Sequence, residues 1–249
     1  MDSKKTCCPE KALPGLAYTG PEPPTINING LRVYEVGSGP KGVVIIHDIF
    51  GLFGGRSLEY SNRLAENGFH VFFPDLLQGY KLTEGTMPIP DFAEKLTNIK
   101  WEVTKKEIFD TLVPYMKSKG VETFAALGFC WGPRVIANIC AENDLFKVAV
   151  NFHASWEAFA IHGDKPYELA EKIRAAQIFL IASNDDPNFK EGGAYVNILK
   201  KNIGDKIKQV YYPKMMHGWV ARTPVDEPET RKEAENAVSK GIEFLKEHL

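Results

Sequence analysis

The chain lacks an uninterrupted apolar run near the ~20 residues that a membrane-spanning helix needs, and its formal net charge is only −2. Residues 1–9 contain neither the apolar core of a signal peptide nor the arginine-rich pattern of a transit peptide. These absences predict a cytoplasmic protein that does not act at a membrane. Because the charges nearly balance, no nucleic-acid partner is expected either.

Cysteine is scarce, and its spacing excludes a disulfide framework. The four cysteines are Cys7, Cys8, Cys130 and Cys140, and a reducing compartment would keep them as thiols. Cys7 and Cys8 are interpreted as two thiols in a mobile arm, with a metal or redox pair as the alternative. Cys140 is expected to pack in the core. No metal and no cofactor is expected.

The length and composition predict one large domain with a substantial core. The chain has 249 residues, of which 44% are hydrophobic and 25% charged, which is ordinary for a globular protein. Residues 1–30 are rich in proline and glycine, so they are expected to form an extended arm. Residues 31–249 are expected to form a single domain, present as a monomer or homodimer.

Strand-like and helix-like segments alternate along this domain. Strands are predicted over 31–36, 42–47, 69–73, 123–127, 146–152, 178–182 and 207–212. Helices are predicted over 57–67, 91–119 with a break near Thr97, 133–141, 167–176, 192–202 and 228–248. This alternation indicates an α/β fold with a mostly parallel sheet covered by helices on both faces. Right-handed crossovers then place the functional loops at the carboxyl ends of the strands.

The most specific pattern is Gly128-Phe129-Cys130-Trp131-Gly132, which lies between a predicted strand and a predicted helix. This context is typical of a nucleophile elbow, here with cysteine in the position usually held by serine. The two glycines remove side chains that would collide in so sharp a turn. The helix N-terminus favours a thiolate. Cys130 is therefore predicted to be the nucleophile, and a buried structural cysteine is the alternative.

A cysteine nucleophile needs a base, and the base needs an acid to orient it. In the order of the α/β-hydrolases, the acid and then the histidine follow later strands. Asp185 and Asp186 follow the strand over 178–182, and His217 follows the last strand. His217 is predicted to be the base. One of the two aspartates is predicted to orient it, and the other is expected to be a turn residue.

Two backbone N–H groups are expected to form an oxyanion hole. One belongs to Trp131, directly after the nucleophile, and the other to Ile49 in the loop after the strand over 42–47. Asp48 in that loop is predicted to contact the thiol or to steer its protonation, with a turn-capping carboxylate as the alternative. His153 also follows a strand at the same edge of the sheet, so it is expected to line the pocket.

Four segments resemble the dienelactone hydrolases (carboxymethylenebutenolidase-like proteins), which are cysteine members of the α/β-hydrolase fold. They are His-Asp-Ile-Phe-Gly-Leu at 47–52, Phe-Pro-Asp-Leu at 73–76, Gly-Phe-Cys-Trp-Gly at 128–132 and His-Gly-Trp at 217–219. The resemblance implies hydrolysis of a lactone or activated ester through a thioester on Cys130. It favours Asp185 over Asp186 as the acid. Bacterial members carry a thiol-activating glutamate where Asp48 stands.

The resemblance also implies a small-molecule ester or lactone as the partner. Arg222 is expected to bind its carboxylate, because bacterial members use arginines for this contact. The other expected substrate-binding residues are Phe50, Tyr80, His153 and Trp219.

Two other functions are weighed against hydrolysis. One is a non-catalytic small-molecule binding protein on the same fold. The other is a thiol redox enzyme that uses Cys130 as its peroxidatic thiol. Such an enzyme favours a resolving cysteine, and Cys140 is about 15 Å away along a helix, too far for a disulfide. Only Cys7 or Cys8 would then remain as the partner.

Overall fold

The structure is a computed structural model that describes residues 8–79, 96–156, 162–224 and 226–249. The strands are β1 (Ile26–Ile28), β2 (Leu31–Val36), β3 (Lys41–Ile46), β4 (His70–Pro74), β5 (Thr123–Phe129), β6 (Phe146–Phe152), β7 (Ala176–Ala182) and β8 (Ile207–Tyr212). The α-helices are α1 (Ser57–Glu66), α3 (Trp101–Lys105), α4 (Val113–Ser118), α5 (Gly132–Glu142), α7 (Pro166–Lys172), α8 (Ala194–Ile203), α9 (Trp219–Arg222) and α10 (Pro228–His248). Among the described residues, no helix is both long and apolar enough to cross a membrane.

The strands form one eight-stranded sheet in the order β1-β2-β4-β3-β5-β6-β7-β8. The pairings of β1 with β2 and of β2 with β4 are antiparallel, and all the others are parallel. The predicted, mostly parallel α/β sheet is therefore confirmed. In the central pair, Ile46 of β3 lies opposite Gly128 of β5, so the loops that follow these two strands leave the sheet side by side.

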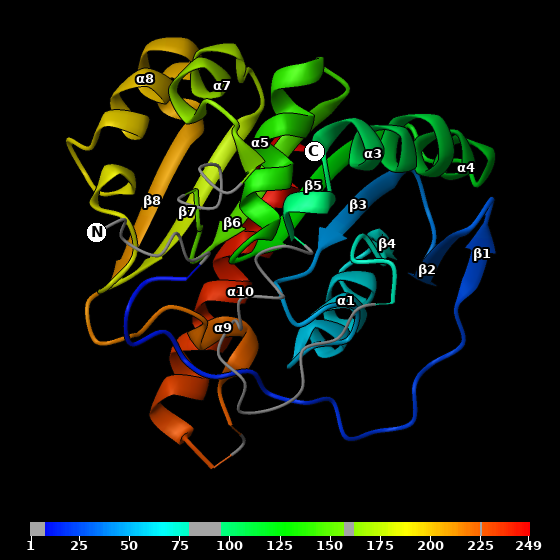
Figure 1. The fold of residues 1–249 in the computed structure, drawn as a ribbon, viewed down its shortest axis with the longest axis horizontal. Helices are drawn as coiled ribbons and strands as arrows, with labels where there is room; N and C mark the ends of the chain where they lie inside the picture. Colours follow the sequence, from blue (N-terminus) through cyan, green and yellow to red (C-terminus); the bar gives the residue numbers. More distant parts are fainter. Residues whose placement is uncertain (1–7, 80–95, 157–161, 225) are drawn as a thin grey trace.

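Side chains of the central strands alternate between two buried clusters, one on each face of the sheet. In β3, Val44 and Ile46 belong to the cluster that includes α5 and α8, whereas Val43 and Ile45 belong to the cluster that includes α1 and α10. Successive residues of a strand point to opposite faces. A strand covered on both faces is therefore apolar at every position, which explains the continuous Val-Val-Ile-Ile run. Figure 1 shows α5 and α10 with the sheet between them.

Most predicted elements agree with the structure to within two or three residues, and the departures have local causes. The helix predicted over 167–176 ends at Lys172. The helix predicted over 91–119 is broken at Ile99 and Lys100 rather than near Thr97, and residues 91–95 lie outside the described residues. Its middle, η1 (Lys106–Leu112), is a π-helix. Pro114 lies two residues after this segment and has no backbone N–H. The regular α-helical hydrogen bond to the carbonyl group four residues earlier therefore cannot form there.

Residues 8–25 contain no helix or strand and lie along the domain surface. The backbone N–H of Leu13 donates to the carbonyl oxygen of His217 at 2.8 Å, and that of Gly55 donates to Leu16 at 2.7 Å. The side-chain amide of Asn184 donates to the carbonyl oxygen of Glu10 at 2.8 Å. Figure 1 shows this arm, in blue, passing α9 and reaching β1 at the far edge of the sheet. The division into an arm over 1–30 and one domain over 31–249 stays a prediction.

Candidate active site

Cys130 sits in a sharp turn between β5 and α5, with a backbone φ of 55°. A positive φ costs a residue with a side chain about 1 kcal/mol or more, and such strain is kept where the surroundings enforce it. A Cβ on Gly132 would come within 2.5 Å of the Ile46 carbonyl oxygen, and one on Gly128 within 3.0 Å of the Gly132 carbonyl carbon. Both glycines are therefore needed for the turn, as the elbow pattern requires.

His217 lies beside this turn and is held from three sides. Its Nδ1 is 2.6 Å from Oδ1 of Asp185, and its backbone N–H donates to Oδ1 of Asn184 at 2.7 Å. Its carbonyl oxygen accepts the bond from Leu13 in the arm. Asp186 instead accepts a bond from the backbone of Asn188 and caps a short 3₁₀-helix. Asp185 is thus the aspartate that contacts the imidazole, whereas Asp186 lies in the turn; a role for Asp185 in orienting a catalytic base stays a prediction.

Ser155 connects the thiol to the imidazole. Its Oγ is 3.8 Å from the Sγ of Cys130 and 3.5 Å from Nε2 of His217. Its backbone N–H donates to the carbonyl oxygen of Cys130 at 2.9 Å, while the N–H of Cys130 donates to Phe152. The hydroxyl therefore lies where it can relay a proton between sulfur and nitrogen. Sequence analysis did not identify Ser155, although it follows β6 at the functional edge of the sheet.

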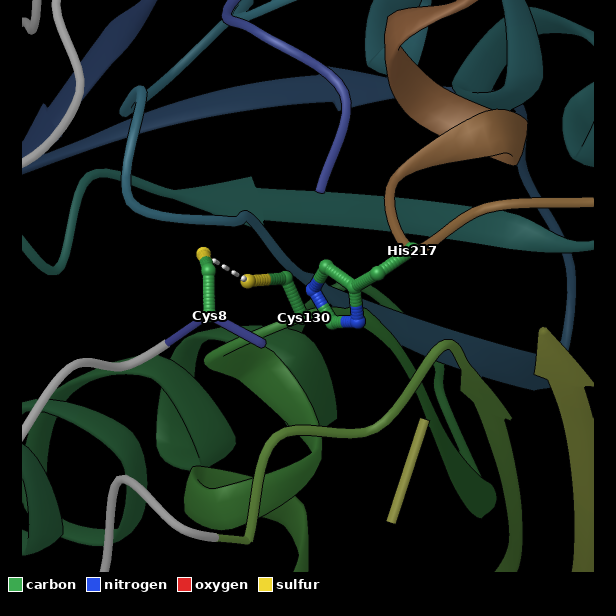
Figure 2. A group of neighbouring side chains, drawn as sticks. All are labelled: Cys8, Cys130 and His217. Atoms are coloured by element: carbon green, nitrogen blue, oxygen red, sulfur yellow. Dashed lines mark hydrogen bonds between the residues drawn. The ribbon is translucent and has the colours of Figure 1, made fainter. Parts of the chain in front are cut away.

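The thiol of Cys130 is covered by Cys8 from the arm. The two Sγ atoms are 3.5 Å apart, and Cys130 is 0% exposed. Figure 2 shows Cys130 between Cys8 and His217. Within the described residues, the ligand atoms of these three side chains all lie within 4.8 Å of one another, and two thiols with an imidazole are a donor set suited to Zn²⁺. The arm therefore closes the site over the sulfur.

Burial raises the pKa of the Cys130 thiol well above its ordinary value, and the neighbouring Cys8 raises it further, whereas His217 and Arg222 lower it. Burial also lowers the pKa of His217, but Cys130 and Asp185 outweigh it and raise this pKa to about 9. The predicted thiolate is therefore disfavoured while the arm covers the sulfur, because burial penalises the charged form most. Exposure of the site to water would remove the largest of these contributions.

Asp48 is engaged away from the thiol. Its Oδ1 accepts from the backbone N–H of Phe50 at 2.8 Å, as in a turn cap, and its Oδ2 accepts from Nε of Arg222 at 2.9 Å. Both side chains are buried. Asp48 thus holds Arg222, which is one of the groups that lower the pKa of Cys130. Direct activation of the thiol by Asp48 stays a prediction.

The two predicted oxyanion donors belong to neighbouring loops. Ile49 follows β3 and Trp131 follows β5, and both residues are buried. The indole ring of Trp131 stacks on His47, with ring centroids 5.7 Å apart. His47 is itself fixed, because its Nε2 accepts from the backbone N–H of Leu76 and its Nδ1 lies 2.7 Å from the Asp48 carbonyl oxygen. These contacts hold the two loops together at the elbow.

The other predicted substrate-binding residues differ in their placement. The ring of Phe50 lies under the guanidinium of Arg222, 4.7 Å from centroid to Cζ, and contacts Gly15 of the arm. His153 is fully buried with its ring centroid 4.9 Å from that of His217. Trp219 is also fully buried and packs on His153, so it supports the site from beneath. Tyr80 lies outside the described residues.

A mostly parallel sheet with this elbow after β5, an aspartate after β7 and a histidine after β8 defines a protein of the α/β-hydrolase class. The chain belongs to the dienelactone hydrolase family, whose family model matches residues 30–249. The arm that carries Cys8 precedes the matched region.

Similar proteins span nearly the whole chain. An uncharacterized AIM2 family protein of Schizosaccharomyces pombe is 27% identical, over 96% of this chain and 98% of that protein. A human carboxymethylenebutenolidase homolog is 21% identical over 84% of this chain and 83% of its own length. A solved structure of a putative dienelactone hydrolase from Klebsiella pneumoniae superimposes with a TM-score of 0.65 at 18% identity, covering 88% of this chain and 93% of that one.

The close contact at Gly132 yields a testable expectation. Gly132→Ala would push a methyl group into the backbone of β3, so it should cost about 1–3 kcal/mol of unfolding free energy in urea titrations. It should also alter the rate at which iodoacetamide alkylates Cys130. Gly120→Ala is the matched control, since Gly120 has a φ of 85° but open space around it. The control should lose about 1 kcal/mol with Cys130 reactivity unchanged; equal reactivity in both variants would contradict the role of Gly132.

The cover over Cys130 predicts a pH effect. Cys8→Ala removes a neighbour that raises the pKa of the Cys130 thiol and opens the site to water. The pH at which Cys130 alkylation is half-maximal should therefore move to lower pH in this variant, because the thiolate is the reactive form. Alkylation would be followed by peptide mapping across a pH series, with Cys140→Ala as the control. An unshifted or higher midpoint would show that Cys8 does not influence the titration.

Proposed function

We propose that this protein hydrolyses lactones or activated esters through a thioester on Cys130. The observation that carries the proposal is the 2.6 Å contact between Asp185 and Nδ1 of His217, with Nε2 of the same ring aimed through Ser155 at a thiol on a strained turn. A carboxylate at Nδ1 fixes the tautomer and orientation that a general base requires. Membership of the dienelactone hydrolase family supports the same chemistry.

The first step is proton transfer from Cys130 to Nε2 of His217, directly or through the hydroxyl of Ser155. The resulting thiolate attacks the ester carbonyl carbon, and the oxygen of that carbonyl becomes negatively charged. The backbone N–H groups of Trp131 and Ile49 are the proposed donors to this oxyanion. One such donor typically contributes about 3 kcal/mol of transition-state stabilisation.

The protonated His217 then gives its proton to the departing alkoxide or enolate, leaving an acyl group on sulfur. Water hydrolyses this thioester with His217 as the base, and Cys130 is regenerated. A thiolate is itself a good leaving group, so a tetrahedral adduct expels an amine less readily than it expels sulfur. Esters with stabilised leaving groups, such as enol lactones, are therefore the proposed substrates, in preference to amides.

Arg222 is proposed to bind an acidic group of the substrate. Its Nη2 is buried without a hydrogen-bond partner among the described residues, and its Nη1 donates to the carbonyl oxygen of Leu13 in the arm. Displacement of the arm would release Nη1, so two parallel N–H groups would face the opened site. This fork matches a carboxylate, while Asp48 retains its bond to Nε.

Substrate entry requires the arm to leave the site, since Cys130 is fully buried beneath Cys8. The arm has no helix or strand of its own between residues 8 and 25. Segments held by a few backbone bonds open locally at a small fraction of the global unfolding free energy. We therefore propose an open state, with residues 8–16 displaced, as the state that turns over.

Substitution of the three central residues tests the proposal. Cys130→Ala should abolish hydrolysis of enol and aryl esters, and Asp185→Asn should lower kcat about 10²–10⁴-fold by disturbing the imidazole tautomer. Asp186→Asn is the matched control, because asparagine caps a helix as well as aspartate does, and its kcat should stay within about threefold. Intact mass should show an acyl adduct on wild-type protein only. Undiminished turnover by Cys130→Ala would refute the mechanism.

The same assay separates hydrolysis from simple binding on this fold. A non-catalytic binding protein would bind the esters equally well as wild type or Cys130→Ala and would release them unchanged. A matched anilide of the best ester should be hydrolysed at least about tenfold more slowly, because the amine is the poorer leaving group.

Arg222 is tested by substrate charge. Arg222→Lys keeps the positive charge but loses the two-pronged geometry, so KM for an ester that carries a carboxylate should rise about tenfold. KM for the corresponding uncharged methyl ester should change by less than about threefold. Equal changes for the two substrates would show that Arg222 acts on the fold or on the thiol instead of on the substrate.

A further inference from the structure

We propose that Cys8 and Cys130 form a redox site in which a hydroperoxide oxidises the two thiols to a reversible intramolecular disulfide. The two sulfurs are 3.5 Å apart although 122 positions separate them in the sequence. A disulfide bond is about 2.05 Å long, so the sulfurs must approach by about 1.5 Å. That the bond switches off hydrolysis rests on the proposed function; formation of the bond does not.

Residues 9–13, which directly follow Cys8, are hydrogen-bonded to one another and to the domain, and so hold Cys8 over the elbow. The carbonyl oxygen of Pro9 accepts from the backbone N–H of Ala12, and that of Glu10 accepts from Asn184. Leu13 is bonded to both His217 and Arg222. These bonds hold the Cys8 thiol beside Cys130 at a high effective concentration. The segment itself is irregular and so can make the small approach that a disulfide requires.

The position of Arg222 favours thiol chemistry over a bound metal ion at this pair. Cys8 and Cys130 are among the causes that raise the pKa of Arg222, which places the guanidinium within electrostatic reach of both sulfurs. A permanent positive charge stabilises the thiolate that attacks a peroxide but repels a second cation. His217 is also placed as a proton carrier, because its Nδ1 contacts Asp185 at 2.6 Å and its Nε2 lies 3.5 Å from the hydroxyl of Ser155, which faces the thiol.

The chemistry balances with the groups present and one hydroperoxide. The Cys130 thiol gives its proton to His217, and the thiolate attacks the peroxide oxygen, which forms a sulfenic acid and releases an alcohol or water. The Cys8 sulfur then attacks the sulfenic sulfur, and the departing hydroxyl takes a proton and leaves as water. Two thiols lose two electrons and two protons, and the peroxide receives them. A small dithiol reverses the reaction by exchange.

Cys140 provides an internal comparison. It is buried in α5 among core residues, as its sequence context predicted, and burial raises the pKa of its thiol to about 12. A buried thiol in apolar surroundings reacts slowly with oxidants. Cys8 is also buried, but it contacts the candidate nucleophile and lies on an irregular segment that a few hydrogen bonds hold to the domain. The proposed redox site therefore requires a cysteine at position 8, beside Cys130, and a cysteine elsewhere in the chain does not replace it.

Mass spectrometry of the full-length protein tests the pair without any assay of hydrolysis. Reduced wild-type protein treated with one to a few equivalents of hydrogen peroxide should lose about 2 Da, and a non-reduced digest should contain a peptide that joins Cys8 to Cys130. Dithiothreitol should restore the original mass. Cys7→Ser and Cys140→Ala, the matched controls, should behave like wild type. Cys8→Ser should instead gain oxygen on Cys130, which dithiothreitol fails to remove once sulfinic acid forms.

Hydrolysis measured on the same samples tests the consequence. Oxidised wild type should lose at least about tenfold in ester turnover, because the disulfide leaves no thiolate, and dithiothreitol should restore it. If the disulfide forms but Cys130→Ala still hydrolyses esters, the proposed function fails and the redox site stands.

Three results would overturn the redox site. The first is a bond from Cys130 to Cys7, to Cys140 or only to a second molecule. The second is oxygen addition to wild type at the rate seen in Cys8→Ser. The third is one equivalent of zinc that survives dialysis of the reduced protein and is lost in Cys8→Ser, which would make the pair metal ligands.

Discussion

The backbone at Cys130 is the constraint on which the site depends. A residue with a side chain is held at a φ of 55° because only two residues separate the end of β5 from the start of α5. The turn also packs closely against the end of β3. A side chain at position 128 or 132 would collide with its surroundings, so both positions are glycine. The same turn presents the sulfur to Ser155 and His217 at the edge where β6 and β8 end. The turn at Cys130 thus brings the thiol to the residues that follow β6 and β8.

Much of this arrangement could be predicted from the sequence because it follows from periodicity and order. Buried strands such as β3 and β6 are continuous apolar runs, and the aspartate and histidine come after the strands that the α/β-hydrolase order requires. The choice of Asp185 over Asp186 came from a family resemblance, and the geometry agrees with it. The π-helical segment before Pro114 and the early end of α7 were missed, since local packing decides them and the apolar pattern does not.

The contacts of the site that the sequence did not predict all involve segments without a periodic pattern. Ser155 lies in an irregular turn after β6, where nothing in the pattern says that a hydroxyl will reach two other loops. Cys8 was interpreted as a thiol in a mobile arm, because no regular structure fixes the path of residues 8–25. Asn184 was given no role by the sequence pattern, yet it is hydrogen-bonded to both His217 and the arm. Long-range contacts of this kind have no local signal in the chain.

The arm buries the sulfur of Cys130, whereas the proposed reaction needs that sulfur to be exposed and ionised. Burial under Cys8 favours the neutral thiol, while the proposed mechanism needs a thiolate open to substrate. The proposed activity would therefore scale with the fraction of molecules in which the arm is displaced. In the proposed mechanism, a negatively charged substrate would shift this balance in its own favour. It would compete with the carbonyl oxygen of Leu13 for Arg222 and so weaken the hold of the arm on the site. The proposed oxidation would act in the other direction, because a bond between Cys8 and Cys130 would remove the open state. On these two proposals, one segment couples substrate charge, thiol ionisation and redox state at the sulfur of Cys130.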